Sequence, residues 1–417
     1  MSAWLLEHAL VEGRVRDTVR VEVEGGVITA VEPDTDRPAT PLRGLTVPGV
    51  ANTHSHVFHR ALRGRTQRGR GSFWTWREQM YDLAARLDPD RLHRLARATY
   101  AEMLAAGYTS VAEFHYLHHQ GDGTPYADPN AMGEAVVEAA RSVGIRLTLI
   151  DTCYLAGGID RPLEPVQRRF ADPDADAWAE RMAAIEHDRV GGAIHSVRAV
   201  PREQLPAVAS ACAGRPLHAH VSEQPAENEA CLAAYGLTPV QLLAEAGALG
   251  PLTTAVHATH LTADDIAVLA ASDTEVSLCP TTERDLGDGI GPARALADAG
   301  VRLSVGSDSQ AVVDAFEEIR AVETDERLAS GERGRFSTDE LLGLGGGRIA
   351  VGEPADLVTL DLASPRTAGT GGGAHTALFA ATAADVVHVV AGGRVVFEGD
   401  HAAIGRSLAT AIEGAWA

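Results

Sequence analysis

Histidine and carboxylate side chains occur in this sequence at spacings typical of metal ligands. His54 and His56 stand one residue apart in NTHSHVFHR, directly after the apolar stretch LTVPGV. Residues i and i+2 of a strand point to the same face, so both imidazoles could bind one ion. In a chain with 17 histidines, a His-x-His pair is a weak signal by itself. The pair indicates a metal site only if other parts of the chain supply further ligands.

The middle of the chain alternates between strand-like and helical patterns, which predicts parallel βα units. Two helix starts are predicted between the strands, because Asp88 and Thr238 can cap a helix and Pro89 and Pro239 suit its first turn. Eight parallel strands close a TIM-type barrel, whose active site lies at the carboxyl ends of the strands. The sequence therefore predicts an α/β fold with a (β/α)8 barrel. The eight strand candidates are LTVPGVANTHSH, TSVAEFH, IRLTLID, IHSVRAV, PLHAHVS, TTAVHAT, EVSLCP and VRLSVGSD.

Both ends of the chain carry short alternating patterns instead. TVRVEV, EGG and VITAVE predict one hairpin near the start, and DVVHVV, AGG and RVVFEG predict another near the end. Together with ADLVTLD, these strands are expected to form a small β-sandwich domain built from both termini. We expect residues 1–47 and 348–417 to form this composite domain with a C-terminal tail, and residues 48–347 to form the barrel.

Length and composition narrow the class of function. A chain of 417 residues can bury a large core without disulfides, and its four scattered cysteines include no CxxC pair, so a reducing cytoplasm is expected. MSAWLLEHAL lacks the basic start of a secretion signal, and no apolar run reaches the length of a membrane span, so we expect no membrane partner. A net charge of -21 disfavours nucleic acid, and an anionic ligand would need a local basic pocket.

Four of the eight predicted strand ends carry the histidine and aspartate residues that are candidates for a metal site. Besides the histidine pair, LHAHVSEQ carries His220 with Glu223 three residues later, VHATHL carries His257, and SVGSDS carries Asp308. Taken singly, each could be a buried histidine, a turn residue or a helix-terminal carboxylate. Their shared place at one end of a barrel favours a site. Three imidazoles and a carboxylate suit Zn²⁺, or Fe²⁺, with a position left for water.

PGVANTHSH, HAHVSEQ, VHATHL and GSDS on eight βα units resemble the metal-dependent amidohydrolase superfamily over nearly the whole chain. Within it, HSHVFHRALRG followed by SFWTWREQMY, with HSVRAV before HAHVSEQ, is similar to the formimidoylglutamate deiminases. This resemblance implies zinc-dependent hydrolysis of N-formimidoyl-L-glutamate to N-formyl-L-glutamate and ammonia in histidine degradation, by a homodimer. It implies one zinc per subunit, with His54, His56, His220 and Asp308 as ligands.

The same resemblance implies roles for other residues. Asp308 and His257 would orient and deprotonate a water that the ion makes more acidic, and Glu223 would carry a proton to the leaving nitrogen. The substrate has two carboxylates, and an acidic protein needs guanidinium groups to bind them. Arg198, expected at the end of strand four, is the first candidate and Arg77 is the second. The expected substrate-binding residues are His59, Arg77, Tyr116, His195 and Arg198.

The sequence departs from the subgroup pattern at three places. His59 stands where glutamine is common, Gln310 follows GSDS where histidine is frequent, and the segment 336–358 is shorter than the usual helix. Two other functions stay open. An aminohydrolase of a cyclic amidine, such as guanine or a triazine, would not need two arginines for carboxylates. A zinc-binding barrel without activity would have no use for Glu223 and His257.

Overall fold

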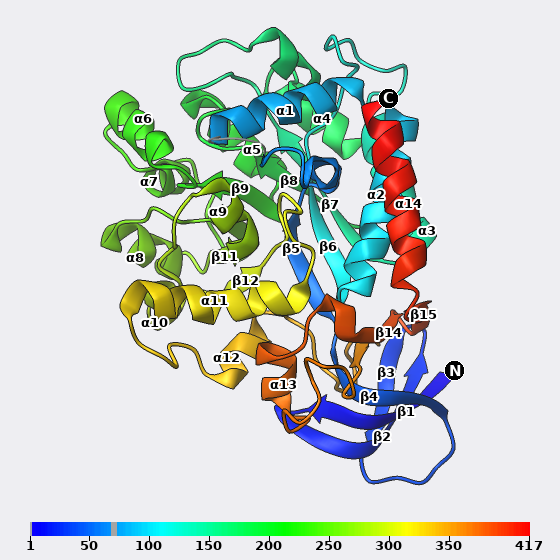
Figure 1. Ribbon diagram of the computed structural model, residues 1–417. Coiled ribbons are helices and arrows are strands. Elements are labelled where there is room, and N and C mark those ends of the chain that lie inside the picture. Colours follow the sequence, from blue (N-terminus) through cyan, green and yellow to red (C-terminus); the bar gives the residue numbers. More distant parts are fainter. Residues whose placement is uncertain (1, 68–72) are drawn as a thin grey trace.

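Eight parallel strands form a barrel in the computed structural model, which describes residues 2–67 and 73–417 (Figure 1). Each strand pairs with the next one along the chain, and a bridge between Ser55 and Asp308 joins the first strand to the last. The predicted (β/α)8 barrel is therefore confirmed. The strands are β5 Val50–Ser55, β6 Tyr108–His115, β7 Arg146–Cys153, β8 Val190–Ile194, β9 Leu217–Val221, β10 Thr253–His257, β11 Glu275–Leu278 and β12 Leu303–Val305.

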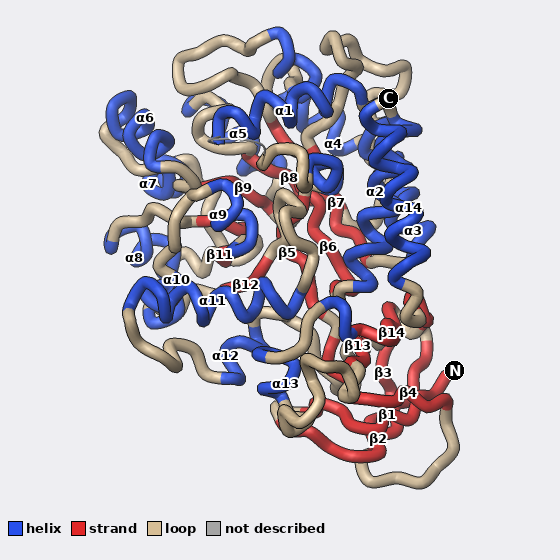
Figure 2. Tube along the Cα trace, viewed as in Figure 1, coloured by secondary structure: helices blue, strands red, loops and turns tan. Residues whose placement is uncertain are grey.

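Helices surround this barrel (Figure 2). Asp88 caps α2 by accepting a hydrogen bond from the backbone of Arg91, and Thr238 caps α7 in the same way from Gln241, as the sequence predicted. Among the described residues, no helix is both long and apolar enough to cross a bilayer. The helices are α1 Phe73–Arg86, α2 Pro89–Ala105, α3 Ala131–Val143, α4 Ala175–Ala183, α5 Leu205–Ala211, α6 Pro225–Tyr235, α7 Pro239–Glu245, α8 Ala263–Ala271, α9 Pro280–Leu286, α10 Ala293–Asp298 and α11 Ala315–Ser330.

Strands from both termini form a second, seven-stranded mixed sheet in the order β15-β14-β13-β4-β1-β2-β3. The two predicted hairpins are present as β2 with β3 and β14 with β15. The sheet curls over its own apolar core, which includes Trp4, Ile28 and Leu357, and a bridge joins Val27 to Pro354 across the curl. The small β-domain built from both termini is thus confirmed. Its strands are β1 Ser2–Val11, β2 Arg14–Glu24, β3 Val27–Glu32, β4 Thr40–Pro48, β13 Leu357–Leu360, β14 Val386–Ala391 and β15 Arg394–Phe397.

Two strand predictions were wrong in their limits. LTVPGVANTHSH is split at Gly49, since β4 belongs to the terminal sheet and β5 to the barrel. HSVRAV forms a turn after β8, so Arg198 lies on that turn. The true strand contains Gly191 and Gly192, which hide the usual β pattern. A Cβ atom at Gly192 would lie 2.4 Å from Cys212 Sγ, so the packing of β8 requires glycine there.

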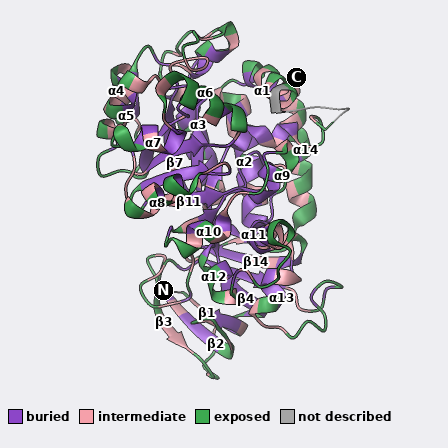
Figure 3. Cartoon of the chain, turned by 90° about the vertical axis from the view of Figure 1, so that its left-hand side faces the viewer, coloured by how far each residue is buried: buried purple, intermediate pink, exposed green. Residues whose placement is uncertain are grey.

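The chain returns to the barrel after the terminal sheet. Helix α14 (His401–Trp416) packs along α2, where Ala98, Leu408 and Ala411 form a small apolar cluster (Figure 1). The shortened segment 336–358 contains one helix, α12 (Thr338–Gly343), before β13 begins, and Leu341 of that helix is buried. Another short helix, α13 (Ala374–Phe379), lies between β13 and β14. Buried residues fill the barrel and the space between barrel and sheet, while the outer helix faces are exposed (Figure 3).

Candidate active site

The four predicted metal ligands meet at the carboxyl ends of the barrel strands. The Nε2 atom of His220 lies 3.2 Å from Nε2 of His54 and 3.3 Å from Nε2 of His56. Oδ1 of Asp308 lies 3.4 Å from Nε2 of His54 and 3.3 Å from Nε2 of His56. Ligand atoms about 2.1 Å from a tetrahedral ion are about 3.4 Å from one another. The spacing of these four buried groups therefore fits one zinc-sized cation.

Hydrogen bonds to the backbone set the orientation of two rings. Nδ1 of His56 lies 2.9 Å from the carbonyl oxygen of Phe114, and Nδ1 of His220 lies 2.8 Å from that of His195. A carbonyl only accepts, so each Nδ1 carries the proton and each Nε2 presents a lone pair to the centre. Burial also lowers the pKa of His54 to about 3. Neutral imidazoles with converging lone pairs are the form that binds a metal.

The turn that carries Asp308 is tied to the strand that carries His54. The Asp308 N–H donates to the His54 carbonyl and the His56 N–H donates to the Asp308 carbonyl, both at 3.0 Å. The side-chain amide of Gln310 donates to Ser55 Oγ at 3.0 Å and to the Asp308 carbonyl at 2.8 Å. Gln310 thereby links the two ligand-bearing segments at a position where the sequence resemblance implied a histidine.

His257 lies beside these donors among carboxylates. Its Nε2 is 3.7 Å from Asp308 Oδ2 and 3.8 Å from Glu223 Oε1, and its Nδ1 is 3.5 Å from Glu283 Oε1. Burial opposes protonation, but the charges of Glu223, Glu283 and Asp308 outweigh it and raise the pKa of His257 to about 10. A divalent cation on the neighbouring donors would lower that value. His257 thus lies between the carboxylates of Asp308 and Glu223, with Glu283 on its other ring nitrogen.

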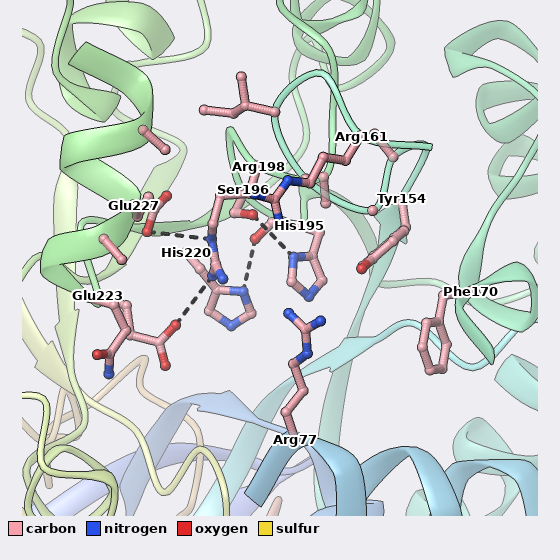
Figure 4. Close-up of a pocket in the computed structure, with 18 of the residues that line it drawn as sticks. Arg77, Tyr154, Arg161, Phe170, His195, Ser196, Arg198, His220, Glu223 and Glu227 are labelled. Atoms are coloured by element: carbon pink, nitrogen blue, oxygen red, sulfur yellow. Dashed lines mark hydrogen bonds and ion pairs between the residues drawn. The ribbon is translucent and has the colours of Figure 1, made fainter. Parts of the chain in front are cut away.

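A cavity of about 800 Å³ adjoins the donors, three of which line it. Figure 4 shows residues that line this cavity, among them His220, Glu223 and Arg198. All the predicted site residues except His54 line it, and His54 lies fully buried beneath. Arg77 reaches the cavity from α1, where its guanidinium also lies 5.3 Å from the centre of the Tyr81 ring. Within the wall, Nε2 of His59 lies 2.8 Å from the Tyr116 hydroxyl. The structure thus brings together the metal, acid–base and substrate-binding candidates that the sequence suggested separately.

Arg198 has two carboxylate neighbours in this cavity. Its guanidinium lies 3.5 Å from Glu223 Oε2 and 3.8 Å from Glu227 Oε2 (Figure 4). Burial raises the pKa of Glu227 to about 7, although the charge of Arg198 acts in the opposite direction. Sequence reasoning missed Glu227. Its place four residues after Glu223, in the first turn of α6, was the only available signal.

Sequence reasoning also missed two other residues of the site. Glu283, which faces His257, lies on α9 after a strand end with no histidine or aspartate. Arg161 lines the cavity from the loop after β7, in the stretch GGIDRPLE. Neither stretch resembles a motif for catalysis or binding, so only the path of the folded chain reveals their position.

Comparison with known proteins places the chain in a family. The amidohydrolase family model matches residues 45–396. The chain is 38% identical to formimidoylglutamate deiminase of Pseudomonas aeruginosa, over 99% of this chain and 98% of the relative. The crystal structure of an amidohydrolase from Brucella melitensis is similar with a TM-score of 0.90 and 30% identity, covering 100% of both chains. The zinc complex of atrazine chlorohydrolase TrzN from Arthrobacter aurescens has a TM-score of 0.87 at 22% identity, covering 99% of this chain and 100% of TrzN. This chain belongs to the amidohydrolase family.

Proposed function

We propose that this protein hydrolyses N-formimidoyl-L-glutamate to N-formyl-L-glutamate and ammonia, a reaction of histidine degradation. The observation that carries the proposal is the arrangement of one cavity, in which Glu223 and His257 lie between a four-donor metal site and the guanidinium of Arg198. This arrangement offers an acid–base pair for an amidine next to a cation for a carboxylate. The 38% identity to a formimidoylglutamate deiminase supports the same substrate.

His54, His56, His220 and Asp308 would hold the metal, and three neutral imidazoles with one carboxylate suit Zn²⁺. When bound, zinc makes a coordinated water more acidic and polarises the amidine. Zinc is also the ion bound by the structurally similar TrzN, which supports this choice.

The side chains of this protein then move the protons. As the water oxygen bonds to the amidine carbon, Asp308 and His257 accept the proton that the water loses. Glu223, 3.8 Å from His257, transfers a proton to the amidine nitrogen. The proton held by Asp308 and His257 then passes to the same nitrogen, and the carbon–nitrogen bond breaks with its electron pair on nitrogen, which leaves as ammonia. The second water proton returns to Glu223 as the carbonyl of the formyl product forms.

The wall of the cavity would hold the remainder of the substrate. Arg198 and Arg77 would bind carboxylates, because a guanidinium can form two parallel hydrogen bonds to one. His195, Tyr116 and His59 would supply further hydrogen bonds from the same wall. Burial lowers the pKa of His195 well below its ordinary value, so this ring would act as a neutral partner.

The test is ammonia release by the purified, zinc-loaded protein. N-formimidoyl-L-glutamate is compared with guanine and with a simple free amidine, with and without added zinc. We expect rapid, zinc-dependent release from N-formimidoyl-L-glutamate alone, and loss of most of this activity in Arg198→Ala. Ammonia release from guanine that is equally fast in wild type and Arg198→Ala would show instead that the substrate is a cyclic amidine. Absence of release from all three substrates by zinc-loaded protein would refute the proposed substrate.

A further inference from the structure

A third arginine, Arg161, lines the cavity, and its side chain is exposed. Arg161 extends from the loop after β7, whereas Arg77 lies on α1 and Arg198 on the turn after β8 (Figure 4). Within residues 2–67 and 73–417, its side chain makes no hydrogen bond and no ion pair, although Asp160 and Glu164 line the same cavity. An exposed guanidinium at the wall of a ligand cavity is available to an anionic ligand.

The loop places Arg161 by its backbone. The Arg161 N–H donates to the Gly158 carbonyl at 3.0 Å, and the Gly157 N–H donates to the Arg161 carbonyl at 3.1 Å. A Cβ atom at Gly157 would lie only 2.4 Å from the Pro162 carbonyl oxygen, so this tight turn requires glycine there. These contacts fix the backbone of Arg161 at the cavity, and its side chain is exposed.

The same loop is joined to the turn that carries Arg198. The N–H groups of Leu155 and Ala156 both donate to the carbonyl of Ala199, at 2.8 and 2.9 Å. Arg161 and Arg198 are thus carried by two segments that are hydrogen-bonded to each other next to the cavity. Both arginines therefore border the same cavity from neighbouring segments.

Arg161 differs from Arg198 in its surrounding charges. Glu223 and Glu227 already balance much of the charge of Arg198, at 3.5 and 3.8 Å. A substrate with two carboxylates would bring two negative charges into this cavity, where Arg198 already faces two carboxylates of the protein. Arg161 is a further cation that no carboxylate of the described chain neutralises by an ion pair.

We propose that Arg161 binds the outer carboxylate of the substrate, the one more distant from the reacting carbon, and thereby selects dicarboxylic over monocarboxylic amidines. This inference rests on the proposed function and deepens it. Arg161 is a specificity-determining residue: its loss weakens binding of ligands with the second carboxylate and leaves ligands without it unaffected.

Binding to the zinc-loaded protein tests the inference without turnover. Dissociation constants of N-formyl-L-glutamate and N-formyl-L-norvaline, which lacks the second carboxylate, are measured by calorimetry for wild type, Arg161→Gln and Arg168→Gln. Arg168 is an exposed arginine outside the cavity and serves as the matched control. We expect Arg161→Gln to raise the dissociation constant of N-formyl-L-glutamate about 10- to 100-fold, the usual effect of losing a charged hydrogen bond. The dissociation constant of N-formyl-L-norvaline should change by no more than about twofold. Equal effects on both ligands, or none on either, would overturn the inference.

Kinetics separate this inference from the proposed function. With N-formimidoyl-L-glutamate, Arg161→Gln should raise KM about 10-fold or more with little change in kcat, because the contact is far from the reacting bond. With N-formimidoyl-L-norvaline, both constants should equal those of wild type. If wild type released no ammonia from either compound, the proposed function would fail, while the two dissociation constants would still decide the role of Arg161.

Discussion

His54 and His220 are 166 residues apart in the sequence, yet their Nε2 atoms face each other at 3.2 Å. Burial lowers the pKa of His54 to about 3 and that of His220 well below its ordinary value, so both rings are neutral near pH 7. The Nδ1–H of His220 donates a hydrogen bond to the His195 carbonyl, so Nε2 of His220 carries a lone pair. A cation between the two rings satisfies this arrangement.

Replacement of one of these rings should therefore remove the metal. We expect His54→Ala to lose nearly all bound zinc and its ammonia-releasing activity, because the remaining donors no longer complete a four-coordinate site. Metal analysis of the purified variant measures the loss directly. His93→Ala, on α2 and outside the cavity, should keep wild-type zinc content. Full zinc occupancy in His54→Ala would remove His54 from the set of ligands.

Replacement of Glu223 should separate metal binding from turnover. Glu223→Gln leaves the four metal donors whole but removes the group that carries protons, so we expect normal zinc content and a loss in kcat of about 10²- to 10⁴-fold. Glu229→Gln is the matched control, since Glu229 is exposed on α6 a few residues later. A Glu223→Gln enzyme with native kcat would show that another group protonates the leaving nitrogen.

The barrel and its candidate metal donors could be predicted because their signals are local. Each strand shows its own pattern, and the TIM-type architecture brings the carboxyl ends of the strands to one face. His220 and Asp308 could thus be grouped with His54 without any coordinates. The limits of β8 were predicted wrongly because Gly191 and Gly192 have no side chains that could show a β pattern. Close packing requires glycine at these positions.

Arg161 and Glu227 could not be predicted, for a different physical reason. The position of Arg161 depends on hydrogen bonds from Leu155 and Ala156 to a turn more than forty residues later, at Ala199. In the sequence, Glu227 looks like an ordinary acidic residue in the first turn of a helix. Only the folded structure shows that it is buried beside Arg198. Both roles arise from tertiary contacts, which leave no periodic or motif signal in the sequence.

The burial of Glu227 predicts a specific dependence of stability on pH. Burial raises its pKa from 4.5 to about 7, so between these values the folded state binds a proton that the unfolded state has lost. The stabilisation by this proton is complete below pH 4.5 and is lost as the pH rises through 7. From pH 5 to pH 8, we expect wild type to lose about 3 kcal/mol of unfolding free energy relative to Glu227→Gln.

Denaturant unfolding of the zinc-loaded proteins across this range measures the difference. Glu229→Gln replaces an exposed carboxylate of the same helix, so its free energy of unfolding should depend on pH in the same way as that of wild type. Parallel curves for wild type and Glu227→Gln would mean that Glu227 is already ionised in the folded protein at pH 5.

Gln310 should determine how tightly the metal is held. Its amide joins Ser55 to the Asp308 carbonyl, and the Ser307 hydroxyl donates to its side-chain oxygen at 2.8 Å. Groups that orient metal ligands typically contribute 10- to 100-fold to affinity, so we expect Gln310→Ala to weaken zinc binding by about that factor. Competition with a chromophoric chelator gives the dissociation constant. Gln310→Glu keeps the length of the side chain but loses the donor, so an unchanged zinc affinity in both variants would contradict this role.

The C-terminal helix should stabilise the segment that follows the histidine pair. The indole N–H of Trp416 donates to the Ala61 carbonyl at 2.9 Å, and Ala61 lies on the 3₁₀ helix Val57–Leu62 directly after His56. The guanidinium groups of Arg65 and Arg86 lie 5.3 and 5.9 Å from the centre of the Trp416 ring, which adds two cation–π contacts.

Trp416→Phe keeps an aromatic ring but removes the indole donor, and so leaves the Ala61 carbonyl without it. We expect the free energy of unfolding to fall by about 1–2 kcal/mol, the usual cost of a lost hydrogen bond in a partly buried place. Urea unfolding measures this loss, with Glu413→Gln on the exposed side of the same helix as the control. Trp416 and Ala61 are 355 residues apart in the sequence, so this hydrogen bond fixes the C-terminal helix to the segment that follows the histidine pair. A Trp416→Phe protein as stable as wild type would show that packing of α14 against α2 alone holds the end of the chain.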